Sequence, residues 1–309
     1  MALLSRVADR IYWGARYIER AEDTVRVVRA FGDVFVDYPR SSTVRWSSLV
    51  AVAGSEATLP QVDGSDEMPV VEYLIADRNH ENSVVMSVER CRENLRTCRE
   101  VLPRPAWAAV NDLSMYVQST APTAVGRFRR GQFLNRVIDD SRRLDGILTS
   151  SMSRDETFEM WRIGRYLERA DMTTRVLGVR ASTLLSLPPG APDEFAEVRW
   201  MSVLSSLSAL QMYQRSTKGA IDGSGVVRFL LFDHRFPRSV AGCLTEIRSS
   251  VLRLPQHDQV LGVIDDADRE LRSCRPAADD GVALDDAMDR VQRALLRIGE
   301  AMHERYFNF

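Results

Sequence analysis

The amino-acid sequence predicts an all-α fold, an internally duplicated multi-helix bundle whose halves are related by a pseudo-two-fold axis. Three observations lead to this fold class. Apolar residues recur at spacings of three and four along most of the 309 residues, as on amphipathic helices. The strict alternation of apolar and polar residues that marks strands is scarce. One charged helical motif is written twice, which indicates a repeated structural unit.

The expected helices are separated by polar segments rich in turn residues. The first is the longest, because the apolar residues from Leu3 to about Val36 form one stripe and Pro39 follows it. Ser83 and Ser239 each precede a segment with helical periodicity and are placed to cap a helix. In chain order, helices are expected at 3–36, around 46–50, and at 84–102, 106–119, 133–151, 155–187, 197–217, 240–254, 257–273 and 284–306, with loops at 54–69, 186–194 and 275–283.

The charged motif reads RYIERAEDTVRV from Arg16 to Val27 and RYLERADMTTRV from Arg165 to Val176, with eight of twelve positions identical. Two further segments recur in the same order. VRWSSLV at 44–50 returns as VRWMSVL at 198–204, and LIADRNHENSV at 74–84 returns as LLFDHRFPRSV at 230–240. The chain is therefore expected to be a single domain, 1–309, made of two repeats, 1–152 and 153–309.

The repeated motif carries its charges on one side of a helix and its apolar residues on the other. The charged set is Arg16, Glu19, Arg20, Glu22 and Arg26 in the first copy, and Arg165, Glu168, Arg169, Asp171 and Arg175 in the second. Exposed pairs are each worth only about 0.2 to 0.5 kcal/mol, which does not explain why both copies keep the pattern. The set is therefore a candidate structural or binding cluster.

Three interpretations of this cluster remain open. In the simplest, the charges form an exposed, solvated face of each helix. In the structural one, the two helices lie side by side, Glu19 reaches Arg169 and Glu168 reaches Arg20, and loss of a buried partner costs about 3 to 5 kcal/mol. In the functional one, the charges line a cleft. Mg²⁺ or Mn²⁺ bound by the four acidic residues is disfavoured, because the neighbouring arginines compete for the same carboxylates. An anionic ligand held by Arg16, Arg20, Arg165 and Arg169 suits the charges better.

Asp77 and Asp233 occupy matching places in the third repeated segment, each a few residues before a capping serine, Ser83 or Ser239. Aspartate in such a place usually folds the loop through hydrogen bonds to the backbone. An active-site acid is the minority interpretation. These four residues are therefore treated as a loop motif.

Composition excludes several classes of function. A net charge of −2 argues against a general binder of nucleic acid or of anionic membranes. No apolar run approaches the roughly 20 residues of a spanning helix. Neither the four cysteines nor the four histidines have metal-ligand spacing. We expect a protein of the reducing cytoplasm that has no metal site, no cofactor, and neither nucleic acid nor membrane as a partner.

With these motifs, the sequence resembles the Alpha-E domain family, an all-helical bacterial family named for its glutamate-arginine motif. The resemblance covers nearly the whole chain and includes LLSRVADRIYWGARYIERAEDT, TSSMSRDETFEMWRIGRYLERADMTTRVL and FLLFDHRFPRSV. The two copies differ in the place of one glycine. In the second copy Gly164 directly precedes Arg165, whereas in the first copy Gly14 is separated from Arg16 by Ala15. The resemblance carries over only Glu19 with Arg20 and Glu168 with Arg169, and it assigns no catalytic residue.

The resemblance implies a cytoplasmic protein encoded near, or fused to, circularly permuted ATP-grasp proteins and transglutaminase-like proteins. Such an association suggests a role in making or modifying a peptide or amide bond. We expect an accessory or scaffold protein without independent catalytic activity that works with an ATP-grasp amide ligase and binds an anionic or peptide substrate, or a partner, at the paired motifs. One alternative is an enzyme with Glu19 or Glu168 as general acid or base, although adjacent arginines lower a carboxyl pKa. Another is a purely structural or oligomer-forming protein.

Overall fold

All regular structure in the computed structural model is helical across the residues that it describes, which are 4–37, 46–53, 66–184, 196–217, 219–274 and 281–307. The all-α prediction is confirmed for these ranges. The helices are α1 (Ser5–Asp37), α2 (Ser48–Val52), α3 (Glu67–Ile75), α4 (Val84–Arg96), the 3₁₀ turn η2 (Arg99–Val101), α5 (Arg104–Ala124), α6 (Arg127–Ser151), α7 (Glu156–Leu184), α8 (Ala196–Ser206), α9 (Leu210–Ser216), α10 (Gly223–Phe232), α11 (Val240–Val251), α12 (Asp258–Ser273), α13 (Gly281–Met302) and the π-helical turn η3 (His303–Phe307).

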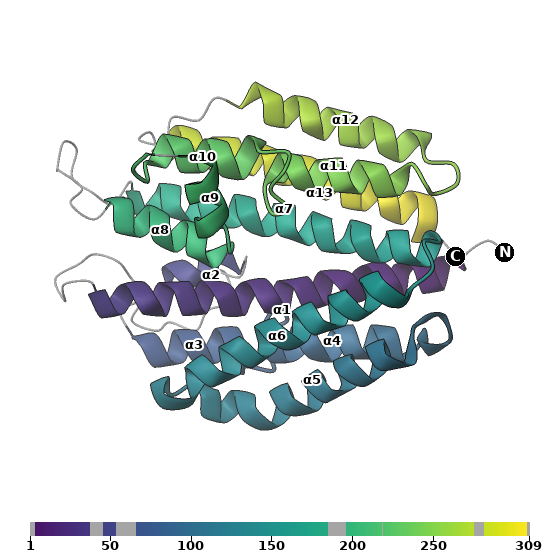
Figure 1. The fold of residues 1–309 in the computed structure, drawn as a ribbon, viewed down its shortest axis with the longest axis horizontal. Helices are drawn as coiled ribbons and strands as arrows, with labels where there is room; N and C mark the ends of the chain where they lie inside the picture. Colours follow the sequence, from purple (N-terminus) through teal and green to yellow (C-terminus); the bar gives the residue numbers. More distant parts are fainter. Residues whose placement is uncertain are drawn as a thin grey trace.

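The two helices that carry the repeated charged motif, α1 and α7, run side by side through the middle of the molecule (Figure 1). Helices α3, α4 and α5 lie on the α1 side, and α10 to α13 lie on the α7 side. Helix α6 crosses α1 obliquely, and α8 also contacts α1. The motif helices are therefore enclosed by the rest of the chain.

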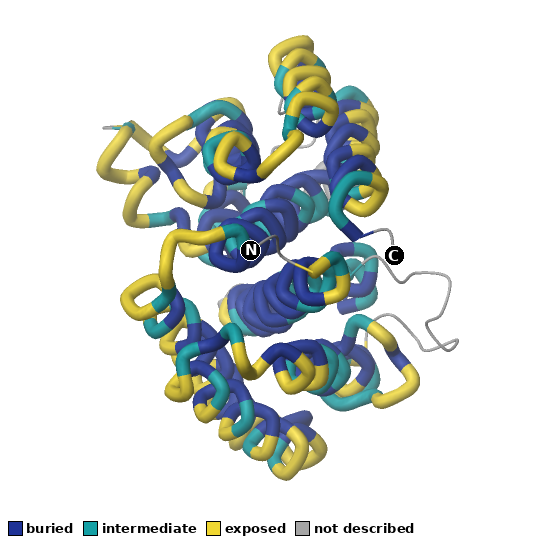
Figure 2. The backbone as a smooth tube through the Cα atoms, turned by 90° about the vertical axis from the view of Figure 1, so that its right-hand side faces the viewer, coloured by how far each residue is buried: buried dark blue, intermediate teal, exposed yellow. Residues whose placement is uncertain are grey.

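Burial follows this arrangement. Seen end-on, the central helices are buried around most of their circumference, whereas the outer helices are buried only on their inward sides (Figure 2). Ile11, Ala15, Ala21 and Val25 of α1 have no exposed surface. A helix that is buried on most sides has little solvent-facing surface on which to place its charges. The charged residues of α1 and α7 must therefore find partners within the protein.

Gly164 of α7 packs directly against the backbone of α1. A Cβ atom at this position would lie 2.4 Å from the main-chain oxygen of Tyr12 and 3.0 Å from the Cβ of Ala15. Gly14 of α1 instead faces Leu95 of α4, whose Cδ2 would lie 3.0 Å from an added Cβ. The two glycines therefore serve two different helix contacts, and only Gly164 serves the α1–α7 contact.

The helix expected at 197–217 is wrong as a single element, because it is two helices, α8 and α9. Between them, Ser208 adopts a left-handed backbone conformation with φ of 52°, which no α-helix continues through. Its hydroxyl accepts a hydrogen bond from Nη1 of Arg26 in α1. A tertiary contact from the central helix thus coincides with the break.

Two short helices were not expected. The apolar stretch at 70–76 forms most of α3, and residues 223–232 form α10. The side chain of Asp222 caps the N-terminus of α10 by accepting a hydrogen bond from the amide of Gly225 at 2.8 Å. The helix expected at 84–102 ends at Arg96, while α5 and α6 extend beyond the ranges expected for them. The expected loop at 186–194 lies outside the described residues. The loops at 54–69 and 275–283 lie partly outside them, and their described residues belong to the starts of α3 and α13.

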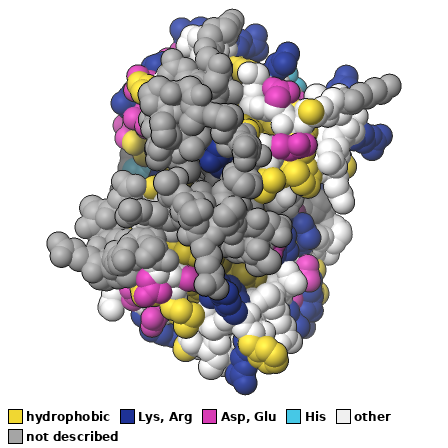
Figure 3. All heavy atoms as spheres, turned by 90° about the vertical axis from the view of Figure 1, so that its left-hand side faces the viewer, with side chains coloured by type: hydrophobic (Ala, Val, Ile, Leu, Met, Phe, Trp, Pro, Cys, Tyr) yellow, Lys and Arg dark blue, Asp and Glu magenta, His cyan; other side chains and the backbone are white. Residues whose placement is uncertain are grey.

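The surface that the described residues form has no single charge character on the face shown in Figure 3, where basic, acidic and hydrophobic side chains are interspersed. Within the described ranges, no helix combines the length and the apolar composition that crossing a membrane requires.

Candidate functional site

The charged residues of α1 and α7 meet across the helix interface in a reciprocal arrangement. The carboxylate of Glu168 accepts hydrogen bonds from Nε of Arg16 and Nε of Arg20, both at 2.6 Å. The carboxylate of Glu19 accepts hydrogen bonds from Nε of Arg165 and Nε of Arg169, both at 2.7 Å. Each glutamate therefore lies between two arginines of the opposite helix. We call these six residues the clasp.

Helix geometry explains why the motif makes these contacts. An arginine, a glutamate and a second arginine at positions i, i+3 and i+4 lie on the same side of a helix, and in α1 and α7 this side faces the other helix. The tyrosine of each motif packs beside the second arginine. The guanidinium of Arg20 lies 5.6 Å from the ring centre of Tyr17, and that of Arg169 lies 5.2 Å from the ring centre of Tyr166.

The clasp is buried, so its interpretation as an exposed charged face is wrong. Glu19 is 0% exposed and Glu168 is 2% exposed. Burial alone would favour the protonated form of Glu168, but Arg20 and Arg16 lower its pKa to about 2. Burial acts in the same direction on Glu19, yet Arg165, Arg169 and Arg238 hold its pKa well below 4.5. Both glutamates are therefore ionised at neutral pH.

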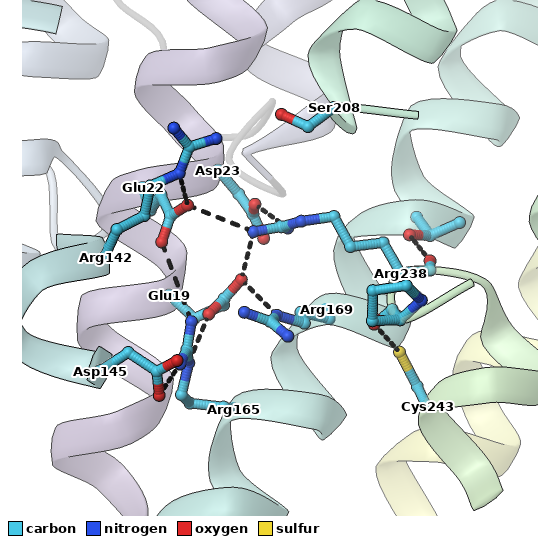
Figure 4. Close-up of polar contacts among 12 residues, drawn as sticks. Glu19, Glu22, Asp23, Arg142, Asp145, Arg165, Arg169, Ser208, Arg238 and Cys243 are labelled. Carbon is cyan, nitrogen blue, oxygen red and sulfur yellow. Dashed lines mark hydrogen bonds and ion pairs between the residues drawn. The ribbon is translucent and has the colours of Figure 1, made fainter. Parts of the chain in front are cut away.

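A further arginine joins the Glu19 end of the clasp (Figure 4). Arg238, from the loop between α10 and α11, donates from Nη2 to Glu19 at 2.7 Å and from Nη1 to Asp23 at 2.5 Å. The same Nη2 lies 3.4 Å from Glu22. Arg238 and Asp23 were not among the predicted site residues. Arg238 lies within the repeated segment LLFDHRFPRSV, but no sequence pattern states where a loop side chain reaches.

The last two charged residues of the motif differ in exposure between its two copies. Glu22 and Arg26 are both 2% exposed and pair within α1, where Nε of Arg26 donates to Glu22 at 3.1 Å. Asp171 and Arg175 make the matching pair within α7 at 2.8 Å, but their side chains are 19% and 32% exposed. One end of the clasp is therefore sealed, and the other is partly open to solvent.

The predicted loop residues lie where they fold the two repeated loops. Asp77 accepts a hydrogen bond from the amide of Asn79 at 2.8 Å, and Asp233 accepts one from the amide of Arg235 at 2.8 Å. The capping serines accept from helix N-termini: Ser83 from the amide of Met86 at 3.3 Å, and Ser239 from the amide of Gly242 at 3.0 Å. Through this loop, the Ser239 cap positions the neighbouring Arg238.

A cavity of about 400 Å³ lies at the open end of the clasp, between α1, α7 and α13. Clasp residues Arg16 and Arg20 form part of its wall, and their side chains are 15% and 18% exposed. Arg293 of α13 is exposed and makes no ion pair with any described residue. The charged residues lining the cavity are Arg16, Arg20, Arg175, Arg293, Asp171 and Asp289.

The chemistry available here is that of binding an anion rather than of proton transfer. A general acid or base needs a pKa near the working pH, whereas arginines keep the pKa values of Glu19 and Glu168 low. Each of these carboxylates is already engaged by at least two guanidinium groups. Across the described ranges, no three histidine, cysteine, aspartate or glutamate side chains are grouped to hold a metal ion. Four arginines facing two aspartates give the cavity a positive lining.

Comparison with known proteins gives one family and three relatives. The family model Alpha-E, described as a predicted alpha-helical domain with a conserved ER motif, matches residues 3–307. An uncharacterized protein of Mycobacterium bovis and two of Mycobacterium tuberculosis are each 26% identical over 273 residues. The match covers 81% of this chain but only 30% of each relative, so the chain spans less than a third of their length. No solved structure matches the chain significantly.

Proposed function

Because the chain belongs to the Alpha-E family, whose ER motif forms the clasp, we propose that it is an accessory module that binds an anionic group and works with an ATP-grasp amide ligase. The observation that carries this proposal is the arginine-lined cavity at the open end of the clasp. The clasp supplies two of the four arginines and holds them rigidly, because Glu168 fixes the Nε atom of each. Their Nη1 atoms are also engaged, that of Arg16 by the hydroxyl of Tyr12 at 3.3 Å and that of Arg20 by Asn82 at 2.8 Å.

The charge balance of the cavity indicates the class of ligand. Four arginines and two aspartates line it, and Glu168 pairs with two of these arginines, Arg16 and Arg20. Four positive and three negative charges leave a net charge of +1. Arginine presents paired donors that match the oxygens of a carboxylate or a phosphate. A cavity of about 400 Å³ is also within the size range of small-ligand sites. A small anion, or the anionic end of a peptide, fits these properties.

Two considerations support an accessory role. Glu19 and Glu168 are held by arginines in a way that opposes acid or base catalysis, which disfavours the enzymatic alternative. The uncharacterized relatives are more than three times as long as the matched region, so in them this region is one part of a longer chain. The ATP-grasp ligase, and the transglutaminase-like protein as a second partner, follow from the family resemblance of the motifs.

We further infer that the domain consists of two related halves, 1–152 and 153–309, about a pseudo-two-fold axis between α1 and α7. The reciprocal contacts support this inference, since Glu19 meets Arg165 and Arg169 while Glu168 meets Arg16 and Arg20. In the repeated sequence these residues correspond pairwise at a constant offset of 149, the distance from Arg16 to Arg165. Under this arrangement, the clasp holds the two halves together.

Titration with inorganic phosphate and with succinate, followed by calorimetry, tests the anion site. Arg293→Ala is the informative variant, because Arg293 lines the cavity and forms no ion pair within the described ranges, so its removal leaves the clasp intact. We expect binding to weaken about three- to fivefold, as for an exposed charge pair. Arg297→Ala, an exposed arginine one turn further along α13 and outside the cavity lining, is the matched control. Equal affinities of both variants and the wild type would contradict the anion site.

Co-purification and ligation assays test the partnership. We expect the chain to co-purify with an ATP-grasp protein encoded beside it, and Arg293→Ala to lower the rate of ligation without disrupting that complex. Arg297→Ala serves again as the control. If no complex forms and addition of the chain leaves ligation unchanged, the partnership is wrong, whatever anion the cavity binds.

A further inference from the structure

The two ends of the clasp differ in what fills the space beside each glutamate. At the Glu19 end, the guanidinium of Arg238 lies between Glu19 and Asp23 and is 2.7 Å and 2.5 Å from them. Arg238 is 6% exposed and Asp23 is 0% exposed. Glu19 therefore accepts from three arginines: Arg165, Arg169 and Arg238. A charged pair from the protein itself seals this end.

At the Glu168 end, the corresponding positions hold smaller or uncharged side chains. Aligning LIADRNHENSV with LLFDHRFPRSV places Asn82 where Arg238 stands, and aligning the charged motifs places Met172 where Asp23 stands. Asn82 accepts a hydrogen bond from Nη1 of Arg20 at 2.8 Å, and it does not bond to Glu168. Glu168 accepts from two arginines only, Arg16 and Arg20, among the described residues.

A second cavity, of about 80 Å³, lies at this place. Asn82, Met172, Glu168, Asp171 and Thr24 are among the residues that line it. Its volume is several times the minimum of about 10 to 15 Å³ that holds one water molecule, and its lining is polar. Arg20, Asp171 and Arg175 line both this cavity and the larger arginine-lined one. The two cavities are therefore adjacent, with these three side chains between them.

The lining of the small cavity specifies the chemistry of the group that would occupy it. Both of its carboxylates, Glu168 and Asp171, are hydrogen-bond acceptors, and each carboxylate has about four lone-pair sites. At the sealed end, the matching space contains an N–H donor from Arg238. Arg20 and Arg175 balance the two carboxylates, so the lining has no excess negative charge to attract a free cation. A neutral N–H donor meets both conditions.

We propose that the two cavities together bind a carboxylate with an adjacent amide N–H, as at the C-terminal end of a peptide. The carboxylate lies among the arginines of the larger cavity, and the amide N–H enters the smaller cavity and donates to Glu168 or Asp171. This inference rests on the proposed anion site and adds the class of ligand to it. The substitution of Arg238 and Asp23 by Asn82 and Met172 is what makes one end of the clasp a binding site.

A pair of isosteric ligands tests the N–H contact without any mutation. N-acetylglycine carries the carboxylate and the amide N–H, and levulinate replaces that N–H with a methylene group. We expect N-acetylglycine to bind the wild-type protein at least about tenfold more tightly, since a hydrogen bond to a charged acceptor is lost with levulinate. N-acetylglycinamide, which lacks the carboxylate, should bind more weakly than either. NMR chemical-shift titration detects such small ligands even when their affinity is low.

The double variant Asn82→Arg, Met172→Asp tests the location. It places the residues of the sealed end at the matching positions of the open end, so it should fill the small cavity and block the N–H contact. The affinities for N-acetylglycine and levulinate should then lie within about twofold of each other. Asn79→Arg adds the same charge to the same loop at an exposed position outside the cavity, and it should leave the tenfold ratio unchanged. Far-UV circular dichroism and thermal unfolding confirm that both variants are folded.

The outcomes separate the two proposals. Equal affinity of the wild-type protein for N-acetylglycine and levulinate would overturn the N–H contact and leave the anion site standing. An unchanged tenfold ratio in the folded double variant would overturn the location of that contact. Absence of binding by both carboxylates, and by phosphate and succinate, would overturn the anion site itself, and this inference with it.

Discussion

Among individual residues, the glutamates of the clasp show how buried charge is tolerated in this protein. A buried ion is expensive unless its partners have good geometry and satisfy its hydrogen-bonding capacity. Glu168 meets this condition through Nε atoms of Arg16 and Arg20, each 2.6 Å from a different carboxylate oxygen. Removal of one member leaves the others charged and desolvated. The clasp is therefore more sensitive to loss of a partner than an exposed ion pair.

Replacing Glu168 with glutamine should destabilise the fold by about 3 kcal/mol, because it leaves the mostly buried guanidinium groups of Arg16 and Arg20 without the carboxylate that pairs with both. Urea unfolding measures the change in free energy. Glu93→Gln is the matched control, since Glu93 pairs with Arg96 at 2.7 Å but the side chains are 52% and 47% exposed. That variant should lose less than about 0.5 kcal/mol. Equal effects of the two substitutions would show that the clasp contributes no more than a surface pair.

Asp23 should give the stability a distinctive pH dependence. Burial, with the nearby carboxylates of Glu19 and Glu22, raises its pKa from 3.8 to about 7, although Arg238 opposes the shift. Between these values the folded protein retains a proton that the unfolded chain releases. The contribution of this proton to the free energy of unfolding is fully present below about pH 4 and is lost as the pH rises towards 7. The wild type should thus lose stability relative to Asp23→Asn over this range, as measured by urea unfolding at several pH values. Parallel pH profiles would contradict this assignment.

The sequence was sufficient to predict the approach of Glu19 to Arg169 and of Glu168 to Arg20, because the repeated motif suggested that α1 and α7 face each other. It was not sufficient to identify Arg238 or Asp23. Asp23 becomes Met172 in the second copy, so repetition did not mark it. Arg238 acts through a loop whose path depends on the packing of α10 and α11. A contact made by a long side chain from a loop has no signature in spacing.

Among the secondary-structure elements, the long helices were predictable because a period of 3.6 residues is unambiguous over many turns. Helices α3 and α10 were missed, since an apolar run of one or two helical turns is too short to display that period. The break between α8 and α9 was missed for another reason. It occurs at Ser208, where a left-handed backbone conformation coincides with a hydrogen bond to Arg26 of α1, and the spacing of residues within 197–217 does not reveal such a tertiary contact.

The contact between α1 and α7 depends on a glycine, and Gly164→Ala should destabilise the protein by about 1 to 3 kcal/mol through overpacking. The added methyl group would lie 2.4 Å from the main-chain oxygen of Tyr12, so the two helices must separate. Gly262→Ala in α12 is the matched control, since nothing lies within 4 Å of its added Cβ. The control should be neutral or stabilising by up to about 1 kcal/mol, because alanine favours helix. Thermal unfolding compares the two variants, and a stabilising effect of Gly164→Ala would contradict close packing.

In the molecule as a whole, α1 and α7 lie in the middle, and they are joined by their own interface and by the contacts of α8 with α1 and of α2 with α7 (Figure 1). The interface combines apolar packing with the buried clasp, and the loop carrying Arg238 reaches across it to Glu19. Each of the two proposed halves, 1–152 and 153–309, would expose its side of this interface on its own. We therefore expect the two to depend on each other for stability.

This dependence predicts that the two halves unfold together, as expected of one cooperative unit. Pulsed hydrogen exchange at increasing urea concentration, read by mass spectrometry, follows peptides from α4 and from α11 separately. Both sets should lose protection at the same urea concentration. Two separated transitions would mean that each half folds on its own and that the domain is not a single unit.

The reciprocal clasp also bears on how the two copies of the motif can diverge. An apolar core residue can be exchanged for another of similar volume at less than about 1.5 kcal/mol, so the packed positions can drift by single steps. A clasp residue has no comparable replacement, because each one pairs with a charge on the opposite helix. Its loss is repaired only by a matched change on that helix. The first of the two changes would cost stability on its own, which opposes its retention. The six clasp positions are accordingly identical in the two copies, whereas Ile18 and Val25 correspond to Leu167 and Thr174.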